Sequence, residues 1–270
     1  MIGIIGVGWL GLPLAQSLES NGFTCKGSTS SVEKLGSLRE KISHVDLLQF
    51  QNGSCKGNLD EFLSGLNTLI ITLPPKSNTP QYDFYLSHLK LILTQSRGKN
   101  IEKLIFTSST GVFEDTCSIT EYNELSSVEA FDKKSRLLIE AEQLILNSEA
   151  FNYKFVVRLG GLVAIDRQPV KYLSGKPLKN SFAPVNLIHQ DDAVEILRLL
   201  IDFKQEEELI FHAVYPLEET REEYYLAKAN ELKIPPPLIE ESIMHKEIKG
   251  KKISSVLSSN LLSFVYKKRP

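Results

Sequence analysis

The N-terminal segment passes from a run of branched apolar residues directly into a helical repeat of apolar residues. Ile2, Ile4 and Ile5 form the run, which is typical of a buried parallel strand. The apolar residues that then recur at helical spacing are Leu12, Leu14, Ala15 and Leu18. Together the two patterns predict a strand that turns sharply into a helix.

The same alternation continues along the chain. Apolar runs predict further strands at residues 23–28, 45–50, 68–73, 103–107, 154–159 and 209–214. Helical repeats predict helices at residues 31–40, 59–66, 82–93, 133–147 and 191–201, with another from residue 220. Polar segments predict loops at residues 51–57 and 108–128. Alternation of this kind predicts an α/β protein with a Rossmann doubly wound parallel sheet.

Residues with capping side chains mark several of the helix starts. Ser31 is expected to cap the second helix, and Asp191 or Asp192 the helix that begins there. Thr220 and Glu223 have the spacing of a capping box.

A change of pattern divides the chain into a core and a lobe. Residues 160–185 are rich in Gly, Pro and Lys and show no sustained period. We therefore expect a dinucleotide-binding Rossmann core and a small C-terminal substrate lobe. The core comprises residues 1–165 with 186–215 returning to it, and the lobe comprises residues 166–185 and 216–270.

The composition argues against several kinds of partner. The chain has 270 residues and a formal net charge of −2, with acidic and basic residues interspersed, which argues against nucleic-acid binding. No apolar run approaches the roughly 20 residues that span a bilayer. No basic leader precedes Ile2, so neither a signal peptide nor a membrane partner is expected.

The cysteines and histidines predict neither disulfides nor a metal site. Cys25, Cys55 and Cys117 are odd in number and far apart, unlike a disulfide framework or a metal-ligand pair. The five histidines show no metal-binding spacing. We therefore expect reduced thiols and a cytoplasmic location.

The turn between the first strand and the first helix contains a glycine pattern. Gly6, Gly8 and Gly11 have the spacing G-x-G-x-x-G, with Trp9 and Leu10 between them. In such a turn one glycine allows the tight bend, the next admits a pyrophosphate, and the third lets helix and strand pack closely. The pattern predicts that these five residues bind a dinucleotide, and the alternative is a turn that binds nothing.

The end of the second predicted strand bears on the choice of nicotinamide cofactor. NAD-preferring sites place an acidic residue there to bind the ribose 2′-hydroxyl. This segment instead contains the hydroxyl residues Ser28, Thr29 and Ser30, expected at the adenosine ribose, and Lys34 follows one turn into the next helix. We therefore favour NADP as the cofactor, with NAD as the alternative.

Four stretches of the chain together resemble the extended short-chain dehydrogenase/reductases, the group of sugar-nucleotide epimerases and dehydratases. They are the glycine turn, FTSSTGVF at 106–113, VRLGG at 157–161 with Arg167 downstream, and VNLIHQDDA at 185–193. The last three are similar to the family patterns S-S-x-x-V-Y-G, R-x-x-G-x-Y-G-P-x-R and N-x-I-H-x-D-D. In detail the chain is most similar to an atypical branch, the YeeZ-like proteins often labelled NAD-dependent epimerase/dehydratase.

The resemblance implies roles for further residues. Those implied at the cofactor are Leu73, Pro74, Thr107 and Ser108. Ser109 would hydrogen-bond the reacting oxygen near the nicotinamide, and Thr110 is a weaker candidate for the same role. The alternative for Ser109 is a hydroxyl that satisfies loop backbone. Arg167 and Asn186 are the candidates for substrate binding.

The chain departs from the family at the catalytic Y-x-x-x-K pair, in which the tyrosine is the acid/base. The corresponding helix contains no tyrosine. If Glu142 matches the family's helix glutamate, the two positions fall on Lys134 and Leu138; a shifted register brings Arg136 nearer the lysine position. Tyr122, the nearest upstream tyrosine, could serve only if its loop folds back.

These features predict an NAD(P)-binding protein of the atypical extended class. The predicted activity is that of an oxidoreductase or epimerase on a small polar substrate such as a nucleotide sugar. The absent catalytic pair leaves open a non-catalytic NAD(P)-binding or sensor protein, and a third alternative is a structural protein without cofactor. A homodimer stays open as well.

Overall fold

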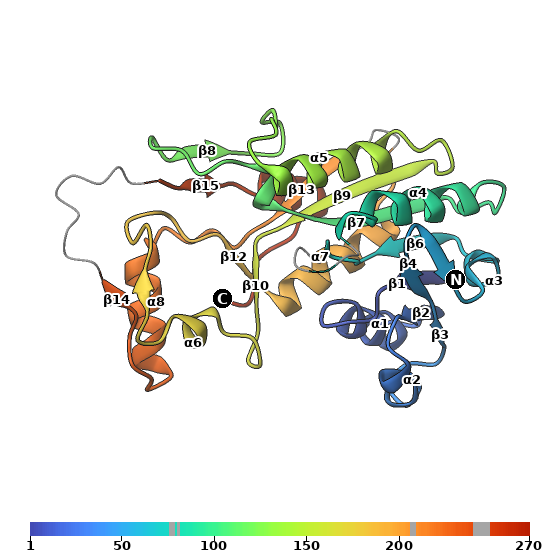
Figure 1. Cartoon of the computed structure of the whole chain (residues 1–270), viewed down its shortest axis with the longest axis horizontal. Coiled ribbons are helices and arrows are strands. Elements are labelled where there is room, and N and C mark those ends of the chain that lie inside the picture. The colour runs from blue at the N-terminus through green and yellow to red at the C-terminus, as the bar shows by residue number, and fades with distance from the viewer. Residues whose placement is uncertain (76–78, 80–81, 206–208, 240–248) are drawn as a thin grey trace.

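A seven-stranded parallel sheet forms the centre of the protein (Figure 1). The computed structural model describes residues 1–75, 79, 82–205, 209–239 and 249–270. In spatial order the strands are β13 (Leu209–Ala213), β9 (Tyr153–Leu159), β7 (Lys103–Ser109), β6 (Thr68–Ile71), β1 (Ile2–Ile5), β2 (Cys25–Thr29) and β3 (Val45–Leu47). All neighbouring strands pair in parallel. The predicted Rossmann doubly wound sheet is confirmed.

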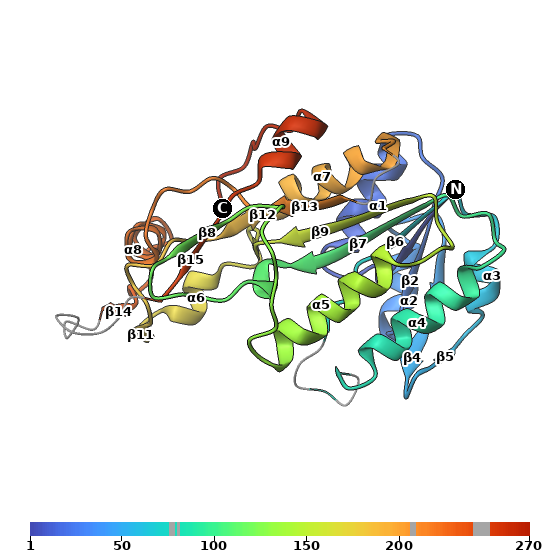
Figure 2. The ribbon, with the colours of Figure 1, turned by 90° about the horizontal axis from the view of Figure 1, so that it is seen from above.

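Helices cover both faces of this sheet (Figure 2). On one face lie α1 (Gly11–Ser20), α2 (Val32–Arg39), α7 (Gln190–Asp202) and α9 (Val256–Leu262). On the other face lie α3 (Leu59–Leu63), α4 (Tyr85–Ser96) and α5 (Lys133–Leu146).

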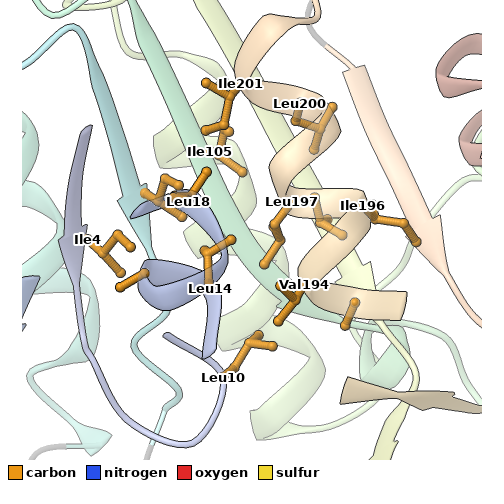
Figure 3. Packing of buried hydrophobic residues seen from close by; sticks show 14 of the residues in the cluster. Ile4, Leu10, Leu14, Leu18, Ile105, Val194, Ile196, Leu197, Leu200 and Ile201 are labelled. Carbon is orange, nitrogen blue, oxygen red and sulfur yellow. The ribbon is translucent and has the colours of Figure 1, made fainter. Parts of the chain in front are cut away.

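An apolar cluster lies on each face of the sheet, and alternate side chains of β1 belong to the two clusters. Ile4 packs into the cluster with Leu14 of α1 and Leu197 of α7 (Figure 3). Its neighbour Ile5 belongs to the opposite cluster with Phe62 and other apolar residues, because successive side chains of a strand point to opposite faces. Burying each such side chain stabilises the fold by about 1.5–3 kcal/mol.

The order of the strands places a crevice at one edge of the sheet. β1 lies between β2 and β6, so the chain reverses its direction of progress across the sheet next to β1. In open α/β sheets, ligands bind at the carboxyl ends of the strands beside this reversal. The glycine turn follows β1 at this edge.

A smaller group of elements lies beyond the carboxyl ends of the sheet strands (Figure 1). It contains β10 (Gly161–Val163), α6 (Pro169–Leu173), β11 (Pro177–Leu178), β12 (Leu187–His189), α8 (Arg221–Glu231) and β14 (Leu238–Ile239). These elements share an apolar core that includes Val170, Leu178 and Tyr224. The predicted lobe also includes residues 240–248, which lie outside the described residues, and its sequence boundaries stay a prediction.

Two short pairs of strands form where the sequence predicts other structure. β4 (Gln49–Gln51) and β5 (Ser54–Lys56) form a hairpin across a predicted strand and a predicted loop. β8 (Thr120–Tyr122), inside a predicted loop, pairs with β15 (Lys251–Ile253).

The helix caps agree with the sequence at two starts and differ at a third. Ser31 and Thr220 accept hydrogen bonds from the first turns of α2 and α8, as predicted. The prediction of Asp191 or Asp192 as a cap is wrong, because His189 is the N-cap of α7 and its ring nitrogen accepts from the Asp191 N–H. The buried Asp192 carboxylate instead accepts backbone N–H groups of the C-terminal segment near Lys267.

Within the described ranges, no helix has the length and apolar character to cross a membrane. The same residues contain no group of three or more His, Cys, Asp or Glu side chains arranged to hold a metal ion.

Candidate functional site

A cavity of ≈ 750 Å³ opens at the carboxyl ends of the central strands, beside the reversal of strand order. Every residue that the sequence predicts at the cofactor lines it: Gly6, Gly8, Trp9, Leu10, Gly11, Ser28, Thr29, Ser30, Leu73, Pro74, Thr107 and Ser108. They come from four strand ends, which explains how residues so far apart in the sequence share one cavity.

The three glycines of the turn have different environments. Gly6 has a φ of 107°, which favours glycine, and its carbonyl accepts a hydrogen bond of 2.7 Å from Thr72 Oγ1. A Cβ on Gly11 would lie 2.3 Å from the Gly6 oxygen. A Cβ on Gly8 would meet nothing within 4 Å. Two glycines are therefore required by the fold, whereas Gly8 keeps open the space on the cavity side.

The backbone around Gly8 offers hydrogen-bond donors. Within the part of the chain that the structure describes, the N–H groups of Trp9, Leu10 and Gly11 donate to no protein acceptor. These groups lie at the start of α1, where the helix dipole favours negative charge. Together with the open space at Gly8, they can accommodate a phosphate group.

Hydroxyl groups and a lysine line the cavity at the end of β2. Thr29 Oγ1 accepts from the Ser31 N–H at 3.2 Å. Ser31 Oγ accepts from the Lys34 N–H at 3.2 Å and donates to Glu33 at 2.6 Å, and this bond lowers the pKa of the Glu33 carboxyl. Lys34 lines the cavity, whereas Glu33 does not.

The charged side chains that line the cavity are all basic among the described residues. They are Lys34, Lys134 and Arg167. Because no carboxylate accompanies them in this lining, the cavity favours a ligand that carries negative charge.

Ser109 and Thr110 are neighbours with different surroundings. Ser109 lines the cavity, and its Oγ accepts from the Gly111 N–H at 3.1 Å in the 3-10 helix η2 (Thr110–Val112). Its own proton is left to donate to a ligand, so the two alternatives for this hydroxyl are compatible. Thr110 is buried outside the lining and its Oγ1 donates to the Leu159 carbonyl at 3.4 Å.

The start of α5 contributes two residues to the cavity lining. Lys134 and Leu138 line the cavity, whereas Arg136 is exposed elsewhere. The Lys134 Cε also lies next to Gly111, near the Ser109 hydroxyl. If Glu142 matches the family's helix glutamate, Lys134 and Leu138 occupy the positions of the absent tyrosine and lysine, and this assignment stays a prediction. Tyr122 stacks on Phe113 with the ring centroids 4.4 Å apart.

The two candidate substrate residues have separate locations. Arg167 lines the cavity, with its Cζ 4.9 Å from the centre of the Trp9 ring. Asn186 is outside the lining and bonds the backbone of β15, donating to the Lys251 carbonyl at 2.8 Å and accepting from the Ile253 N–H at 2.9 Å. The structure therefore brings Arg167, but not Asn186, to the cavity.

Sequence reasoning also missed several lining residues. Gly160, Gly161 and Leu162 follow β9, and Phe50 lies in the unpredicted hairpin. The first three carry a usable signal, because the carboxyl ends of parallel strands meet at one edge and β9 follows β7 in the sheet.

The chain resembles known proteins in its sequence and in its fold. No model of a known protein family matches the sequence. The chain is 29% identical over 268 residues to Protein YeeZ of Escherichia coli (strain K12), which covers 98% of this chain and 95% of that protein. This similarity confirms the resemblance to YeeZ-like proteins that the motifs predict.

Solved structures of epimerases and related proteins share the fold. MoeE5 in complex with UDP-glucuronic acid and NAD has a TM-score of 0.77 at 12% identity, covering 99% of this chain and 94% of that chain. The human epimerase family protein SDR39U1 (isoform 2) with NADPH has a TM-score of 0.72 at 15% identity, covering 99% and 95%. UDP-N-acetylglucosamine 4-epimerase from Bacillus cereus has a TM-score of 0.72 at 14% identity, covering 99% and 93%.

Proposed function

We propose that this chain, a homologue of Protein YeeZ with the Rossmann fold of the epimerase structures above, binds NAD(P) in the cavity beside the glycine turn. The observation that carries the proposal is the open space at Gly8, next to backbone N–H groups that donate to no acceptor among the described residues. A basic lining suits the charge of the diphosphate.

The proposed preference is for NADP over NAD. The cavity lining at the end of β2 consists of hydroxyl residues and Lys34, without a carboxylate. A carboxylate there would bind the ribose hydroxyl of NAD and repel a 2′-phosphate. Hydroxyls and an ammonium group instead suit the phosphate.

The proposed activity is that of an oxidoreductase or an epimerase. When bound, NAD(P) would supply hydride transfer at its nicotinamide ring. Ser109 would donate its hydroxyl proton to the reacting oxygen in a hydrogen bond. Lys134 would exchange a proton with that oxygen, because it lines the cavity and its Cε lies close to the Ser109 hydroxyl beside Gly111.

The proposed substrate is a small polar molecule, and nucleotide sugars are the class named for MoeE5 and for the epimerase structures. A second proposal is a non-catalytic NAD(P)-binding sensor. It rests on one observation, which is that the described lining contains no tyrosine to act as acid and base.

A turnover assay separates these two proposals. The protein would be incubated with NADP and UDP-glucose or UDP-glucuronic acid, with reduced cofactor followed by absorbance and sugar products by chromatography. An enzyme forms product, and Ser109→Ala and Lys134→Met each lower kcat by about 100-fold or more without weakening cofactor binding. The matched control is Lys133→Met, since Lys133 pairs with Asp83 at 3.0 Å outside the lining.

Absence of product with the wild-type protein, despite saturable cofactor binding, favours the sensor. A cytoplasmic location remains part of the proposal, supported by Cys25 and Cys55, which form no disulfide among the described residues.

A further inference from the structure

The turn that follows β10, in the smaller group of elements that we call the lobe, contacts the glycine turn. Ala164 and Arg167 exchange two backbone hydrogen bonds of 3.0 Å, which close a tight turn after β10. From this turn, Asp166 accepts a hydrogen bond from Trp9 Nε1, 3.1 Å from its Oδ2. Gln190, at the start of α7, donates to the Trp9 carbonyl at 2.6 Å. Trp9 is thus held by two segments that are distant in the sequence.

The Arg167 side chain uses this contact to reach the cavity. Its Cζ lies 4.9 Å from the centre of the Trp9 ring, which is within the range of a cation–π contact. Within the described ranges its guanidinium N–H groups donate to no protein acceptor. A guanidinium that contacts an aromatic ring and has no protein acceptor can direct two of its N–H groups at two oxygens of a phosphate.

Arg167 and Gly8 line the same cavity and are connected through Trp9, the residue that follows Gly8. The Gly8 side offers open space and backbone N–H donors. The Arg167 side offers a full positive charge. Asp166, the carboxylate of the same turn, bonds the Trp9 ring and is not part of the cavity lining.

We propose that Arg167 binds the diphosphate of the dinucleotide from the lobe side, opposite the glycine turn. The inference rests on the proposed cofactor site and changes the role that the sequence suggests for Arg167 from substrate to cofactor. The diphosphate then lies between core and lobe, so the bound cofactor ties the lobe turn to α1. Arg167 is a cofactor ligand, and Asp166 positions it by fixing the Trp9 ring.

Calorimetric titration of the full chain tests this assignment. The probes are NADPH and ADP-ribose, which contains the diphosphate but no nicotinamide. Arg167→Met is expected to weaken both by about 10- to 100-fold, the effect of losing one charge-assisted contact. Arg167→Lys keeps the charge without the planar fork, and is expected to lose less. The matched control Lys171→Met removes an exposed charge from the adjacent helix, outside the lining, and leaves both affinities unchanged.

Each result has a distinct meaning. Unchanged affinity of Arg167→Met for both probes overturns the inference, because this is the result expected if Arg167 binds the substrate instead of the cofactor. Weaker binding of NADPH by Arg167→Met, with unchanged binding of ADP-ribose, also overturns the inference, because the contact would then involve the nicotinamide half of the cofactor. A wild-type protein that binds neither probe contradicts the proposed function itself. Circular dichroism and the unfolding midpoint of Arg167→Lys and Arg167→Met establish that the variants are folded.

Discussion

The Arg158 guanidinium and the Glu142 carboxylate form a two-point ion pair between β9 and α5. The Nε–Oε1 distance is 3.0 Å and the Nη2–Oε2 distance is 2.7 Å, and only 2% and 3% of the two residues are exposed. Ser108 Oγ donates to the same carboxylate at 2.5 Å. Because Ser108 lines the cavity, this pair connects the wall of the proposed cofactor site to the buried framework behind it.

Removing one partner of this pair should destabilise the fold. Glu142→Gln leaves the Arg158 charge buried without its counter-ion, and the free energy of unfolding is expected to fall by about 3–5 kcal/mol. The double variant Glu142→Leu with Arg158→Leu should regain part of that loss. Urea titration measures both. Glu140→Gln, on the exposed face of the same helix, is the control and should stay within about 0.5 kcal/mol of wild type; an equally small effect of Glu142→Gln contradicts the account.

The stability should depend on pH through His212. Burial lowers the pKa of this imidazole from its ordinary 6.5 to about 4, and the nearby Arg158 charge acts in the same direction. Because the unfolded chain takes up the proton first, stability is full above pH 6.5 and falls as the pH drops to about 4. Over that window the loss is roughly 3 kcal/mol.

Urea unfolding at a series of pH values measures this effect. His212→Asn keeps a donor for the Ser254 carbonyl, to which the His212 Nδ1 lies at 2.8 Å, and should show a shallower loss between pH 6.5 and 4. Equal slopes for the variant and the wild type would assign the acid sensitivity to other groups.

Lys34 should set the choice between NADPH and NADH. Lys34 belongs to the cavity lining at the end of β2, where a 2′-phosphate is expected. Lys34→Met should weaken NADPH about tenfold, which corresponds to about 1.4 kcal/mol, and leave NADH unchanged. Lys41→Met, an exposed residue outside the lining, should change neither. A ratio of the two dissociation constants that does not move excludes this role for Lys34.

The sequence predicts the fold and the residues that line the proposed cofactor cavity, because both depend on local patterns of residue types. The apolar runs and helical repeats fix the strands and helices in order, and parallel strands bring their carboxyl ends to one edge. The glycine spacing locates the turn, and the structure adds that Gly8 alone among its three glycines leaves open space.

Features that depend on contacts between residues far apart in the sequence cannot be predicted from such local patterns. Ser109 and Thr110 are adjacent, so their side chains diverge and only Ser109 meets the cavity. Asn186 bonds β15, whose pairing with β8 has no local signal. The β4–β5 hairpin, by contrast, has a local sequence signal. Asn52 and Gly53 form a pair typical of tight hairpin turns, and their φ angles are 49° and 75°.

The central claim is that the space at Gly8 receives the diphosphate of NAD(P), and Trp9, the single tryptophan of the chain, is the reporter for it. The measurement is a titration of wild type and Gly8→Ala with NADPH, followed by Trp9 fluorescence, alongside thermal unfolding. Wild type should give a saturable change. Gly8→Ala should keep the wild-type unfolding midpoint, because its Cβ meets no atom of the described residues within 4 Å apart from its chain neighbours. It should nevertheless bind NADPH at least about tenfold more weakly. A wild-type protein that gives no saturable change with NADPH or NADH, or a Gly8→Ala variant that binds as tightly as wild type, would contradict the claim.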